Sequence, residues 1–62
     1  MDVFTATMIA EGVEEPENEE QYYEAWQTLI DTGVVWQLQG FFGRNAVALI
    51  ENGLCHPKVK EA

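Results

Sequence analysis

The sequence predicts an all-α fold, a small bundle of three to four short helices, and three observations support this prediction. Residues 19–32 repeat apolar side chains at the spacing of one helix face. Gly12, Gly33 and Gly53 stand where helices would end. A chain of 62 residues forms one small domain, 1–62, and has no room for a three-stranded sheet beside such helices.

The N-terminal segment 2–10 favours a helix. Its apolar residues recur at i, i+3, i+7 and i+8, namely Met1, Phe4, Met8 and Ile9. Asp2 is placed to cap this helix and Gly12 to end it. A strand is the alternative, because residues that favour strands also alternate at Val3, Thr5, Thr7 and Ile9.

Residues 13–18 form an acidic connection that leads into the next helix. The run 13–20 contains five glutamates and Pro16 and shows no apolar period. Asn18 is the expected N-cap, and Glu19 and Glu20 would lie in the first turn, where the positive end of the helix dipole favours carboxylates. We prefer this local explanation for the glutamates; the alternative is an acidic strip on which a partner docks.

Residues 19–32 give the clearest helical pattern in the chain. The apolar positions fall at i, i+4, i+7 and i+8, and a glycine follows at i+11: Tyr22, Trp26, Leu29, Ile30 and Gly33. Such a stripe indicates the face that packs against the core, and the glycine suits a helix C-terminus.

Residues 34–52 predict a helical hairpin with a glycine corner. We expect Trp36 and Leu38 in a short first helix and the corner at Gly40 to Gly43, where a side chain at Gly43 would cause strain. The second helix should have an apolar face made of Phe42, Ala46, Leu49 and Ile50. After Gly53, residues 56–62 should form a frayed tail.

The same glycines resemble two nucleic-acid-binding motifs. Leu38 to Ile50 resembles a helix-hairpin-helix motif, whose glycine-rich hairpin holds a DNA phosphate with backbone N–H groups. The glycines here are two residues apart instead of one, and Arg44 is the only nearby cation. Gly40 to Gly43 also resembles the GXXG loop of a KH domain, but that fold requires a sheet and the family does not place phenylalanines in the loop. The preferred explanation is a close turn between helices.

No constellation for catalysis, a metal or a cofactor is present in the sequence. Cys55 and His56 are adjacent, but neither a second cysteine nor a second histidine completes a nucleophilic or metal site. We expect Cys55 to pack as a small apolar side chain at a helix end. Arg44 should pair within the chain, with Asp31 or a glutamate of the 19–32 helix.

The net charge of -8 favours a basic protein surface as partner. It opposes contact with nucleic acid or an anionic membrane, because both are negatively charged. The sequence shows neither a membrane-spanning stretch nor the pattern of a signal peptide, which favours a cytoplasmic protein. Seven aromatic residues exceed what so small a core readily buries, so a homodimer is a further expectation.

Several stretches resemble a family of very short, uncharacterised tailed-phage proteins: Ala25-Trp26, Ile30 to Gly33, Trp36 to Ala46, and Leu49-Ile50 with Gly53 and Cys55. The likeness covers about half of the chain, from the 19–32 helix to Cys55. Its members have no agreed biochemical role, so the resemblance implies a viral, bacteriophage origin. Small acidic phage proteins are often inhibitors of host machinery, including anti-CRISPR proteins and DNA mimics, and this class agrees with the charge.

The sequence therefore predicts a non-enzymatic acidic interaction protein, a phage inhibitor that docks on a basic site of a host nucleic-acid-handling complex. Two alternatives stay open, a virion or assembly component and a nucleic-acid-binding module of helix-hairpin-helix type. The expected partner-binding residues are Glu14, Glu15, Glu17, Glu19, Glu20, Tyr23, Trp36, Phe41 and Arg44.

Overall fold

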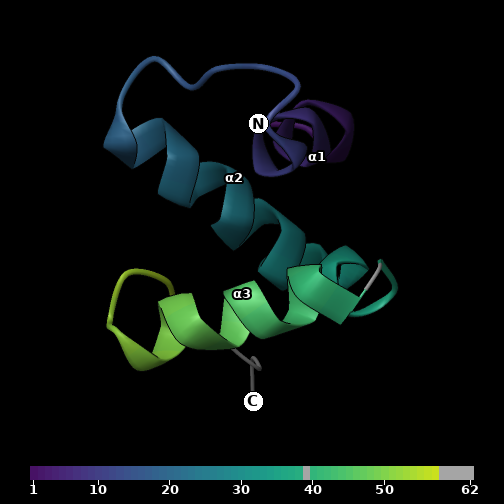
Figure 1. Cartoon of the computed structure of the whole chain (residues 1–62), viewed down its shortest axis with the longest axis vertical. Helices are drawn as coiled ribbons and strands as arrows, with labels where there is room; N and C mark the ends of the chain where they lie inside the picture. The colour runs from purple at the N-terminus through teal and green to yellow at the C-terminus, as the bar shows by residue number, and fades with distance from the viewer. Residues whose placement is uncertain (39, 58–62) are drawn as a thin grey trace.

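Helices make up the regular structure of the protein, for which the computed structural model describes residues 1–38 and 40–57. Their order is α1 (Val3–Glu11), α2 (Glu19–Thr32), a 3-10 turn η1 (Val34–Trp36) and α3 (Gly40–Glu51). Figure 1 shows α2 running between α1 and α3. The described residues contain no strand, so the predicted all-α fold is confirmed, and the first segment is a helix.

Local capping explains where α1 and α2 begin and end. The Asp2 carboxylate accepts a hydrogen bond from the backbone N–H of Thr5 at 3.3 Å, and the Asn18 side chain accepts one from Gln21 at 2.8 Å. Gly12 and Gly33 end these helices with φ of 81° and 80°, in the left-handed region that side chains disfavour. All four predicted helix boundaries are therefore confirmed.

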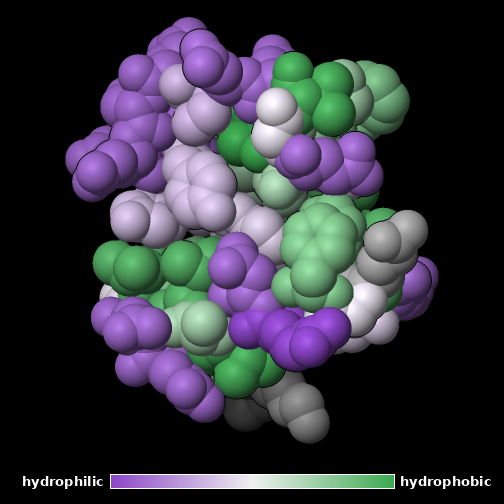
Figure 2. All heavy atoms as spheres, in the orientation of Figure 1, coloured by the Kyte–Doolittle hydropathy of each residue, from purple (hydrophilic) through white to green (hydrophobic). Residues whose placement is uncertain are grey.

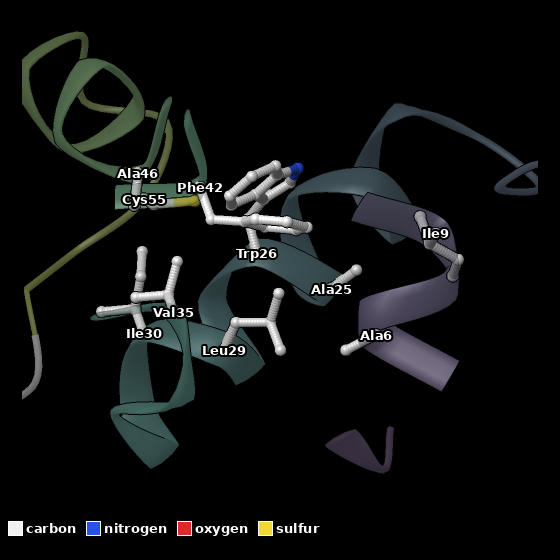
Figure 3. Close-up of a cluster of buried hydrophobic side chains, with 10 residues drawn as sticks. All are labelled: Ala6, Ile9, Ala25, Trp26, Leu29, Ile30, Val35, Phe42, Ala46 and Cys55. Atoms are coloured by element: carbon white, nitrogen blue, oxygen red, sulfur yellow. The ribbon is translucent and has the colours of Figure 1, made fainter. Parts of the chain in front are cut away.

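Small side chains bring α1 close to α2. Ala6 on α1 and Ala25 on α2 are both fully buried, and Figure 3 shows Ala6 on the side of α1 that faces α2. The predicted apolar face of α1 was wrong at Phe4, whose side chain is 73% exposed. The helix turns Ala6 inward instead, because a small residue lets the two backbones approach closely.

Aromatic rings, in contrast, separate α3 from α2. The Trp26 ring of α2 lies 5.8 Å from the Phe42 ring of α3, measured between centroids, and Figure 3 shows the two side by side. Val35 of η1 is completely buried beside them. The predicted core stripe of α2 is confirmed at Trp26, Leu29 and Ile30. Offset ring pairs of this kind add about 0.5–1.5 kcal/mol beyond the area that they bury.

The predicted glycine corner was wrong in its position. Gly40 and Gly43 lie in the first turn of α3, and neither has a positive φ. The chain turns earlier, at Gly33 and through η1, and Leu38 lies after that turn. A glycine inside a helix costs about 1 kcal/mol relative to alanine but does not end the helix. Gly43 therefore stays helical, and the Trp36 ring packs next to it.

The C-terminal segment returns to α2 after Gly53. Cys55 is buried, as predicted, and its Sγ donates to the Tyr23 carbonyl oxygen at 3.6 Å. The Gln27 side chain both accepts from the His56 N–H at 2.7 Å and donates to the His56 carbonyl oxygen at 2.9 Å. The backbone of His56 is therefore bonded to α2, and residues 58–62 of the predicted frayed tail, 56–62, lie outside the described residues.

Replacing Gly43 by alanine should stabilise the fold by about 0.5–1 kcal/mol, because alanine is the better helix former. The new methyl group would meet the Trp36 ring at 3.7 and 3.8 Å, which is ordinary van der Waals contact. Urea melts followed by circular dichroism would measure the change. Gly33→Ala is the matched control and should destabilise by about 1 kcal/mol, because it places a side chain at positive φ. A Gly43→Ala protein less stable than the parent would contradict this packing.

Candidate functional site

The predicted acidic residues form a continuous exposed surface. Each of them is solvent-exposed, namely Glu14, Glu15, Glu17, Glu19 and Glu20. Within the described residues the only ion pair joins the N-terminal amino group of Met1 to Glu24, at 4.0 Å. Figure 2 shows hydrophilic atoms gathered at the upper left, where Figure 1 places the loop between α1 and α2. No described cation neutralises these five carboxylates.

The acidic loop is attached to both helices that it connects. At its start, the backbone N–H groups of Val13 and Glu14 donate to the Met8 carbonyl oxygen at 3.0 and 3.2 Å. At its end, the Glu17 N–H donates to the Gln21 side chain at 2.6 Å. These bonds limit the conformations of the loop, so its charges are presented in a restricted arrangement.

Arg44 does not form the predicted pair. The described residues show no salt bridge between Arg44 and Asp31 or any glutamate. The guanidinium instead folds back along α3, since a methyl group placed on Gly40 would lie 3.6 Å from its Nη2 atom. Asp31 accepts a hydrogen bond from the Gln27 side chain. A cation that has no carboxylate partner among the described residues of so acidic a chain is a candidate for contacts with a ligand.

The predicted aromatic binding residues have different environments. Trp36 and Phe41 are 52% and 48% exposed, so both can contact a partner. Tyr23 is half-buried, packs against the core and lies edge-on to Tyr22, with ring centroids 5.5 Å apart. Tyr23 therefore contributes mainly to the fold.

A pocket of about 470 Å³ lies where α1, α2 and α3 meet. Its lining combines aromatic, polar and small side chains: Ala10, Tyr22, Trp26, Phe41, Arg44, Asn45 and Ala48. Of the predicted partner-binding residues, Phe41 and Arg44 lie together in this pocket. The sequence analysis did not predict the other lining residues as site residues. The four lining residues on α3 fall at i, i+3, i+4 and i+7: Phe41, Arg44, Asn45 and Ala48. This spacing places them on one helix face and could have been read from the sequence.

The indole nitrogen of Trp26 is the only buried side-chain nitrogen or oxygen in the described residues that lacks a hydrogen-bond partner. The Trp26 side chain is 1% exposed and also lines the pocket. Figure 3 shows the nitrogen at the outer edge of the core cluster, directed away from Leu29 and Val35. A buried donor without an acceptor costs about 1–3 kcal/mol. A ligand that brought an acceptor to the Trp26 N–H would remove this cost.

Three further observations concern a metal site, a membrane-spanning helix and the helix-hairpin-helix motif. Within residues 1–38 and 40–57, no three His, Cys, Asp or Glu side chains gather as metal ligands would. No helix in that part of the chain is long and apolar enough to cross a membrane. The helix-hairpin-helix motif expects its glycines in a hairpin between two helices, whereas Gly40 and Gly43 both belong to α3 and the described residues before them, 33–38, contain the 3-10 turn η1.

Comparison with known proteins gives one match. A family model described as a domain of unknown function (DUF7417) matches residues 14–61, and the chain therefore belongs to this family. Neither a curated protein nor a solved structure matches the chain. The matched range includes the acidic loop and the α2 and α3 walls of the pocket, and it excludes α1.

Cys55 should be protected from thiol reagents in the folded protein. Burial raises the pKa of its thiol above the ordinary 9.0, and the negative charge of Asp31 raises this pKa further. The unfolded thiol loses its proton at a lower pH than the folded thiol, so stability should fall as pH rises above about 9. Urea melts across that range would measure the fall, with Cys55→Ala as the control that lacks it. Equal labelling rates for the folded and the urea-unfolded protein at pH 8 would contradict the burial.

Proposed function

We propose that this member of the DUF7417 family is a non-enzymatic interaction protein that docks its acidic loop on a basic site of a partner protein. The observation that carries the proposal is the set of five exposed glutamates without a described cation partner. Glutamates that served only to cap α2 would need to lie in its first turn, whereas Glu14, Glu15 and Glu17 precede the N-cap residue Asn18. Local helix stabilisation therefore explains only two of the five.

The partner class follows from the charge. Protein grooves that hold nucleic acid present clustered lysines and arginines, and an acidic surface competes for them. We therefore propose a nucleic-acid-handling complex as the target. Because the chain resembles tailed-phage proteins, we propose that this complex belongs to the host cell and lies in the host cytoplasm. The protein would then be an inhibitor of the anti-CRISPR or DNA-mimic kind. Nucleic acid itself would be repelled by the net charge of -8.

Exposed aromatic side chains supply anchors for such docking. Trp36 packs beside Gly43 at the start of α3, and its side chain is half-exposed. Tryptophan is enriched among the residues that dominate binding energy, whereas peripheral charges act mainly on the rate of encounter. The glutamates should therefore guide association, and Trp36 should slow dissociation.

Assembly with apolar partners is a second candidate function. Seven large apolar side chains among residues 1–38 and 40–57 are exposed: Met1, Phe4, Val13, Trp36, Phe41, Val47 and Leu54. Such surface on a small chain suits a homodimer or a virion or assembly component. This assembly function would not depend on the acidic loop. Substitutions in the loop therefore distinguish it from docking by charge.

Replacing the five exposed glutamates of the loop and the first turn of α2 by glutamine should slow association with the partner by about tenfold or more, because electrostatic steering raises association rates by 10 to 10³-fold. The partner would first be captured from host lysate, and surface-based kinetics would then be measured at low and high salt. Rising salt should weaken binding of the parent steeply, since exposed charges are screened beyond about 8 Å at physiological ionic strength. Added nucleic acid should compete.

Trp36→Ala is the matched control, because it should hasten dissociation and leave association nearly unchanged. Circular dichroism would verify that both variants remain folded. An association rate that responds neither to the five substitutions nor to salt would contradict docking by charge. Sedimentation of the parent as a concentration-dependent dimer, with the same charge independence, would then favour the assembly function.

A further inference from the structure

The pocket between the three helices concentrates hydrogen-bond donors on a chain that is otherwise strongly acidic. Trp26 lines it, and the buried N–H of this side chain has no described acceptor. Arg44, Asn45 and Tyr22, whose side chains also carry hydrogen-bond donors, line the same pocket. An arginine and an indole can only donate, so the group that satisfies both must be an acceptor.

The electrostatics of α3 favour the same kind of ligand. Arg44 folds back toward Gly40, the first residue of this helix of 12 residues, which has no acidic side chain in its first turn. A helix N-terminus carries a positive partial charge and is stabilised by an anion. Placing the guanidinium there adds a second positive charge. Glu11 of α1 lines a neighbouring hollow with Phe41, but no described carboxylate forms an ion pair with Arg44.

The size and walls of the pocket restrict which anion fits. A volume of about 470 Å³ lies within the range of small-molecule sites, which is about 300–1,000 Å³. Phe41, Tyr22 and Ala48 provide apolar wall beside the donors. A doubly charged phosphate would face stronger repulsion from a chain of net charge -8 than a singly charged group would. A monoanion with an apolar body suits these walls best.

We propose that this pocket binds a small monoanionic carboxylate with an apolar, preferably aromatic, body. The carboxylate pairs with the Arg44 guanidinium at the start of α3, and one oxygen accepts from the Trp26 indole N–H. The nitrogen is buried, so binding requires neighbouring side chains to move and uncover it, which side chains do within nanoseconds where they are exposed. A free aromatic acid and the C-terminus of a peptide share this chemistry. No glutamate lines the pocket, so the site stands apart from the acidic loop's proposed role.

The experiment follows the Trp26 indole N–H resonance of ¹⁵N-labelled protein during titration with benzoate. The chain has two tryptophans, and a Trp36→Phe variant assigns the resonance of Trp26. We expect a saturable shift of that resonance. Benzamide, which has the same ring and no charge, should bind at least about tenfold more weakly, because hydrogen bonds to charged groups contribute about 1.5–3 kcal/mol. N-Acetylphenylalanine represents a peptide C-terminus, and binding tighter or weaker than benzoate identifies which source of carboxylate fits better.

Two variants of equal net charge test the role of Arg44. Arg44→Gln and Gln37→Glu each change the net charge from -8 to -9, and Gln37 is exposed and outside the pocket. Benzoate affinity should fall about tenfold or more in Arg44→Gln and stay unchanged in Gln37→Glu. Because Arg44 is exposed, its replacement should leave the fold intact, unlike a change at Trp26. A shift linear in benzoate concentration, equal binding of benzamide, tighter binding of inorganic phosphate, or equal affinities in the two variants would overturn the proposal.

Discussion

The indole ring of Trp26 is the contact on which the three helices depend. It is 1% exposed and lies in the middle of α2, the helix between the other two. Its ring centroid is 5.8 Å from that of Phe42 on α3, and the buried cluster continues through Ala25 to Ala6 on α1. Removing a buried aromatic ring costs about 3–5 kcal/mol. A 62-residue domain has only about 3–9 kcal/mol in total, so little else could replace this contact.

The same ring produces the pocket. Ala6 and Ala25 allow α1 to lie close to α2, whereas the Trp26 and Phe42 rings hold α3 further away. Three helices at unequal separations leave a hollow beside the larger rings, and the Trp26 nitrogen borders it. The molecule consequently has two surfaces of different character. One is the acidic loop, suited to a basic protein surface, and the other is a small cationic pocket whose charge is that of Arg44 alone.

How far the sequence predicts this structure depends on how local each cause is. Helix α2 was predictable because its stripe, its cap Asn18 and its final Gly33 all act within a few residues of one another. The face of α1 was not, because periodicity cannot show that Ala6 packs closely against a helix 19 residues later at Ala25. The predicted corner at Gly40 to Gly43 was misplaced because a glycine permits a corner without requiring one. The acidic surface is visible in composition, but the pocket combines side chains from three helices, and the periodicity within α2 and within α3 cannot show that these faces meet.

Trp26 should couple the stability of all three helices. Native-state amide exchange of a Trp26→Ala variant measures this directly, with Trp36→Ala as the matched control at a half-exposed tryptophan. We predict that Trp26→Ala loses protection in α1, α2 and α3 together, and that Trp36→Ala keeps it in all three. Persistent protection of α1 and α2 with loss confined to α3 would show that the alanine contact suffices for that pair, and would contradict the central role of Trp26.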